Sequence, residues 1–101
     1  MKIIVEQFWQ DLGEVEKKVQ QHVKEALIFL RDNNKQNLLN GFTLEHERVQ
    51  VKITGITEDY CLDVSEVGIP ELLGMHIYEV ESFDVYELLL LLREIKDKLE
   101  Q

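Results

Sequence analysis

The hydrophobic pattern of this chain changes its period twice, and these changes limit the folds that it can adopt. Over residues 6–31 apolar side chains recur every three or four positions, as in a helix with one apolar face. They are Phe8, Leu12, Val15, Val19, Val23, Ala26 and Leu30. Residues 32–34, Asp-Asn-Asn, are a typical helix end. We therefore predict one long N-terminal helix, with residues 2–5 either extending it or forming a short strand.

Apolar and polar residues then alternate, which is typical of strands with one buried face. Residues 48–54 follow this pattern strictly, and residues 42–45 follow it just before them. We predict that these two strands form an antiparallel hairpin that turns near residues 46–47. Residues 60–65 predict a third strand and residues 75–80 a fourth.

A helical pattern returns over residues 83–99. Ser82 is a suitable N-cap for this helix. Residues 88–92 are five consecutive leucines, which leave the helix no polar side. In one interpretation the helix is buried inside the monomer. In the other, which we favour, Leu90 or Leu91 faces a second subunit in a symmetric homodimer.

These patterns together predict a single α+β domain over residues 1–101. It comprises a long N-terminal helix, an antiparallel sheet of three to four strands, and an apolar C-terminal helix packed on the sheet. A chain of 101 residues can bury roughly two-thirds of its unfolded surface, which is enough for one core. One Pro and five Gly argue against disorder.

Negative charge is concentrated in the middle of the chain. Residues 53–92 contain no Lys or Arg but nine acids, and this base-free segment accounts for the net charge of −9. The sequence pI is about 4.7. Nucleic acid backbones and anionic membranes would repel such a protein, so we expect no direct binding to either. A basic protein is the natural complement.

The chain has one cysteine, Cys61, and therefore forms no intramolecular disulfide. This fits a reducing compartment. The apolar stretch at residues 3–5 is too short for a signal peptide. The longest apolar run, residues 88–92, is far shorter than the ~20 residues of a membrane span. We expect a cytoplasmic protein.

Residue types that carry chemistry are present but not arranged in a recognisable motif. The histidines His22, His46 and His76 are not at metal-ligand spacings. Cys61 is best interpreted as a half-buried strand cysteine. Glu79 and Glu81 would share one face of a strand, but that spacing is common. We expect no catalytic residues, no metal and no cofactor.

The acids of the base-free segment suggest a contact surface. Some have local explanations, such as a helix start or a turn, and the segment could serve only as a solvated face. A row of acids nevertheless crosses the predicted strand-to-helix junction with two tyrosines beside it, and Tyr is enriched at interfaces. We predict a partner-binding row formed by Glu79, Glu81, Asp84 and Glu87 with Tyr78 and Tyr86.

The leading hypothesis is a small non-enzymatic protein that inhibits or regulates a basic partner through this row. If the partner binds nucleic acid, carboxylates spaced like phosphates could occupy its groove. In composition alone, the chain resembles small acidic inhibitors of mobile-element (for example phage) or immunity type. The alternative is a homo-oligomeric assembly subunit that uses the leucine-rich C-terminal helix.

Overall fold

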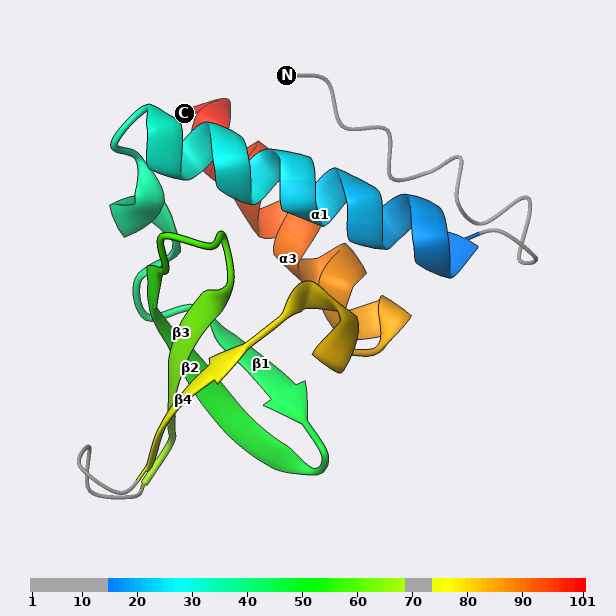
Figure 1. Cartoon of the computed structure of the whole chain (residues 1–101), viewed down its shortest axis with the longest axis vertical. Helices are drawn as coiled ribbons and strands as arrows, with labels where there is room; N and C mark the ends of the chain where they lie inside the picture. The colour runs from blue at the N-terminus through cyan, green and yellow to red at the C-terminus, as the bar shows by residue number, and fades with distance from the viewer. Residues whose placement is uncertain (1–14, 69–73) are drawn as a thin grey trace.

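The computed structural model describes residues 15–68 and 74–101. In Figure 1 the helices lie toward one end of the molecule and the sheet lies toward the other. The elements are α1 (Val15–Asp32), the 3-10 turn η2 (Gln36–Leu39), β1 (Thr43–His46), β2 (Val49–Ile56), β3 (Leu62–Glu66), β4 (Met75–Tyr78), the 3-10 turn η3 (Val80–Ser82) and α3 (Val85–Leu99). The predicted helix start at residue 6 and the choice for residues 2–5 lie outside the described residues.

The four strands form one antiparallel sheet in the order β1-β2-β3-β4, which confirms the predicted α+β fold. The β1–β2 hairpin turns through Glu47 and Arg48, whose φ angles are 49° and 69°. Two consecutive positive φ values are typical of a type I′ turn, which matches the twist of paired strands. Neither residue is the Asn or Gly that this turn prefers.

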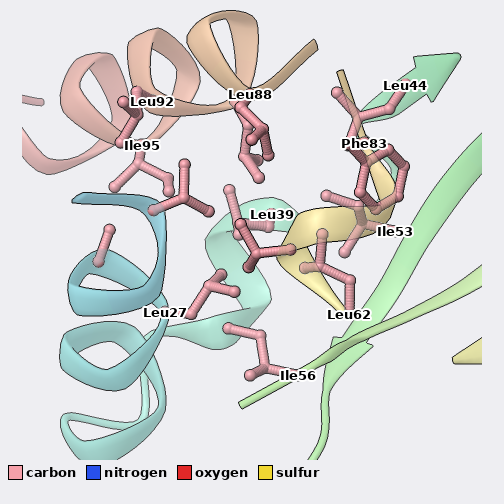
Figure 2. Close-up of a cluster of buried hydrophobic side chains, with 14 of the residues drawn as sticks. Leu27, Leu39, Leu44, Ile53, Ile56, Leu62, Phe83, Leu88, Leu92 and Ile95 are labelled. Atoms are coloured by element: carbon pink, nitrogen blue, oxygen red, sulfur yellow. The ribbon is translucent and has the colours of Figure 1, made fainter. Parts of the chain in front are cut away.

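One face of the sheet is covered by the helices and the other is open. Two cross-strand pairs on the covered face are buried: Leu44 with Val51, and Ile53 with Val64. Figure 2 shows this core, to which α1, η2, the sheet and α3 all contribute side chains. On the opposite face, hereafter the outer face, Lys52 and its neighbours along β2 are exposed. The alternating sequence pattern therefore reports burial correctly.

The last helix begins two residues later than predicted. Asp84, not Ser82, is its N-cap: the Asp84 backbone is extended and its carboxylate accepts a hydrogen bond from the Glu87 N–H at 3.2 Å. Ser82 ends η3 instead, and Phe83 lies buried between the two helical segments. The prediction was wrong because a separate helical turn comes between β4 and α3.

Most of the leucine run is buried within the protomer. Helix α3 packs along α1 and also contacts β1 and η2. Leu88, Leu89, Leu91 and Leu92 are buried, whereas Leu90 is 51% exposed. The expectation that Leu91 lies on an oligomer interface is therefore wrong, because α1 and the core already enclose that side of the helix. Leu90 is the leucine of this run that reaches the surface.

Candidate functional site

The structure divides the predicted acidic row into separate local environments. Asp84 caps α3, as described above. The Glu87 Oε1 atom accepts a hydrogen bond from the Glu45 backbone N–H at 3.1 Å. Burial raises the pKa of Glu87, and the charges of Asp84 and Glu45 add to this effect, whereas the hydrogen bond from Glu45 lowers it. These two acids therefore have structural roles within the fold.

The two tyrosines of the row also differ from each other. Tyr78 is half-buried, and its ring lies 4.1 Å from that of His46 and 5.7 Å from that of Phe83. Tyr86 is 65% exposed on α3. Tyr78 thus belongs to an aromatic cluster under the sheet, while Tyr86 lies on the helix surface.

Glu79 and Glu81 do come together, in a cleft of about 530 Å³. It lies between α1, the β2–β3 loop and the segment that contains η3. We call it the acidic cleft; its lining residues are Lys24, Ile28, Asp59, Tyr60, Cys61, Glu79, Val80 and Glu81. The sequence pattern predicted Glu79 and Glu81, but not the residues that α1 and the loop contribute.

The loop wall of the acidic cleft is held by specific hydrogen bonds. The Thr57 Oγ1 atom accepts a hydrogen bond from the Cys61 N–H at 3.0 Å. The Tyr60 backbone has a φ of 59°, and its hydroxyl donates to Asp32 Oδ1 at 2.9 Å. This bond and the Asp32 charge raise the pKa of Tyr60 above its ordinary value of 10.0. Tyr60 therefore ties the loop to the end of α1.

The charge balance of the acidic cleft is negative. Among the described lining residues, Asp59, Glu79 and Glu81 supply three carboxylates, and Lys24 supplies the one ammonium group. Lys24 forms an ion pair with Glu81, and this hydrogen bond holds the pKa of Glu81 below its ordinary value near 4.5. Asp59 and Glu79 remain in excess, so the cleft favours a cation over an anion.

The chemistry-bearing residues do not converge on one place. Cys61 lines the acidic cleft, and its Sγ atom lies 3.8 Å from the Asp59 carbonyl oxygen. The His76 Nε2 atom lies 3.1 Å from Glu66 Oε1, and His76 is not part of the cleft lining. Within residues 15–68 and 74–101, no three His, Cys, Asp or Glu side chains are grouped so that they could hold a metal ion.

None of the helices in the described part of the chain has the length and hydrophobicity needed to cross a membrane. Comparisons with protein-family models, with curated proteins and with solved structures found no match to this chain.

Proposed function

We propose that this chain is a small non-enzymatic binding protein that inhibits or regulates a basic protein partner. The observation that carries the proposal is the acidic cleft, in which the base-free segment places Asp59, Glu79 and Glu81 around one hollow. An excess of carboxylates there speeds encounter with a basic surface and selects it by complementary potential. The proposed binding acids therefore differ from the row predicted from sequence. They include Asp59 and leave out Asp84 and Glu87.

The acidic cleft also offers apolar area, which charge alone lacks. Ile28 is exposed on α1, and Tyr60 of the β2–β3 loop also lines the cleft. Lys and Arg have long apolar stems below their charged groups, and Arg also stacks on aromatic rings. A Lys or Arg of the partner can therefore bury its stem against Ile28 and Tyr60 while its cation meets Asp59 and Glu79.

Charge also argues for a protein partner over nucleic acid or a membrane surface. Phosphates would meet the net charge of −9 and the two uncompensated carboxylates of the cleft. The described lining contains Cys61 but no histidine that could serve as its base. We place the protein in the cytoplasm, where a lone thiol stays reduced.

Two matched variants test this proposal as baits in a host lysate. Asp59→Lys/Glu79→Lys changes the cleft, and Glu47→Lys/Asp97→Lys changes exposed acids elsewhere; each raises the net charge from −9 to −5. We expect the native chain and the second variant to capture the same basic protein, released by salt, and the cleft variant to lose it. Retention of that protein by the cleft variant would refute the proposed site.

A second candidate function, a homodimeric assembly subunit, has one observation in its favour. Tyr86, Leu89, Leu90 and Arg93 line a shallow hollow of about 190 Å³ on α3, where Tyr86 and Leu90 are exposed. On this hypothesis light scattering gives a dimer mass for the native chain and a monomer mass for Leu90→Lys. A monomer mass for the native chain at micromolar concentration excludes it.

A further inference from the structure

The two edges of the sheet differ in how far the rest of the molecule covers them. On the β1 edge, the carboxylate of Glu87 accepts the Glu45 N–H, and α3 packs against the strand. The β4 edge has no comparable cover in the part of the chain that the structure describes, where the β4 backbone hydrogen-bonds only to β3. One edge is thus closed by a side chain, and the other can accept a strand.

The strand β4 is short, with four residues, but its side chains do not protect this edge. Natural edge strands commonly carry Lys or Pro, or are bulged, so that other chains do not pair with them. The strand reads Met75, His76, Ile77, Tyr78 and contains neither Lys nor Pro. Met75 and Ile77 are on the outer face and are 56% and 66% exposed. In the described part of the chain, this edge therefore offers both backbone groups without a partner strand and apolar side chains.

The charges around β4 indicate what kind of strand it would accept. Asp63 lies opposite Ile77 in the β3–β4 ladder, and Glu66 lies at the end of β3. Glu79 follows β4 directly and lines the acidic cleft. The base-free segment itself adds no Lys or Arg here, and Lys52 lies one strand further in, opposite Ser65. A basic extended segment is complementary to this edge, and an acidic one is not.

We infer that an extended segment of the basic partner adds to β4 as a fifth strand and places a Lys or Arg in the acidic cleft. This inference rests on the proposed function and adds its mode of binding. In strand addition, main-chain hydrogen bonds supply affinity and alternate side chains supply specificity. Apolar residues of the segment would lie beside Met75 and Ile77, and its cationic end would continue past Glu79 into the cleft.

Two synthetic peptides of identical sequence test the inference with the full chain. Both alternate Val and Lys and end in Arg; one has free backbone N–H groups, and the other is N-methylated along the Val-Lys stretch. Charge and side chains are equal, and the methylated peptide lacks the backbone N–H groups that pair with an edge. We expect the methylated peptide to bind at least about tenfold more weakly, and the free peptide to slow amide exchange in β4 but not in β1.

Matched protein variants give a second measurement. Ile77→Lys puts a positive charge beside the incoming basic strand, and Thr43→Lys adds the same charge to an exposed position of β1. We expect Ile77→Lys to weaken binding of the free peptide several-fold and Thr43→Lys to leave it nearly unchanged. Equal affinities of both variants would contradict strand addition.

The remaining outcomes separate this inference from the proposed function. If both peptides bind equally and the β4 amides are not protected from exchange, strand addition is wrong. The proposed function, binding of a basic partner, would still be supported. If neither peptide binds at low salt, the inference and the proposed function both fail. If β4 amides become protected with increasing protein concentration and no peptide, a second copy of this chain occupies the edge, which overturns the inference.

Discussion

Glu87 illustrates how one acid of the base-free segment serves the fold. It lies in the first turn of α3, where a negative charge suits the helix dipole. That placement was predictable from sequence. Its hydrogen bond to the Glu45 N–H was not, because the two residues are 42 positions apart and meet only once the hairpin has docked on α3. Local chemistry is readable from sequence, whereas a contact between elements is not.

The raised pKa of Glu87 gives a prediction about stability and pH. A carboxyl whose pKa is higher in the folded than in the unfolded state destabilises the fold when ionised, and this cost disappears as the pH falls through the raised value. Glu87→Gln removes the charge and keeps an oxygen that can accept from Glu45. At pH 7 we expect urea denaturation to give the Glu87→Gln variant a free energy of unfolding at least as high as that of the native chain. This difference should shrink as the pH is lowered toward 4.

Glu87→Ala is the control for this prediction. It removes the acceptor together with the charge, so it should lower the free energy of unfolding by about 1 kcal/mol relative to Glu87→Gln. Equal stability of the Gln and Ala variants would show that the hydrogen bond to Glu45 contributes nothing.

The β1–β2 hairpin provides a prediction at the scale of one element. Glu47 and Arg48 both have positive φ, which costs a residue with a Cβ atom roughly 1–2 kcal/mol. Asn-Gly is the preferred pair for a type I′ turn. Glu47→Asn/Arg48→Gly should therefore raise the free energy of unfolding by about 1 kcal/mol or more, measured by urea denaturation.

Tyr60 is the matched comparison for the hairpin, because it also has positive φ. Tyr60→Gly relieves the same backbone strain but removes the hydroxyl that binds Asp32. We expect no gain in stability from Tyr60→Gly. An equal gain at both sites would mean that the tie between the loop and α1 has no energetic value.

Helix α3 offers a sharper comparison, between two adjacent leucines. Leu91 is fully buried, so Leu91→Ala should cost about 2–5 kcal/mol of unfolding free energy. Leu90 is exposed in the protomer, and Leu90→Ala should change stability by less than about 0.5 kcal/mol. Thermal or urea unfolding of both variants checks this. A large loss at Leu90 would indicate that a second subunit covers it.

The elements themselves were largely predictable. The three-to-four spacing of α1 and the alternation in β2 each report one buried face, and both faces are found in the core. The leucine run could not be resolved in this way. Every position from Leu88 to Leu92 is apolar, so which one is exposed depends on how α3 is rotated against α1.

At the scale of the whole molecule, the candidate site depends on topology. Asp59 and Glu79 are twenty positions apart, and the antiparallel β3–β4 pair returns the chain to the same end of the sheet. Lys24 enters from α1 and pairs with Glu81. The sequence indicated an excess of acids in this segment, but only the fold determines which of them share a cleft.

The net charge of −9 predicts that salt has opposite effects on folding and on binding. Like charges repel within the compact state, and raising NaCl from about 10 mM to about 150 mM shortens the Debye length from roughly 30 Å to roughly 8 Å. We therefore expect the Tm to rise over this range while affinity for the basic partner falls. Calorimetry and a binding titration in the same buffers measure both.

The Glu47→Lys/Asp97→Lys variant tests whether repulsion is the cause of the salt effect on Tm. Its net charge of −5 leaves less repulsion to screen, so its Tm should rise less with salt than that of the native chain. A Tm that falls with salt in the native chain would mean that ion pairs such as Lys24–Glu81 outweigh the repulsion. Because the cleft is unchanged in this variant, its affinity for the partner should keep a salt dependence close to that of the native chain.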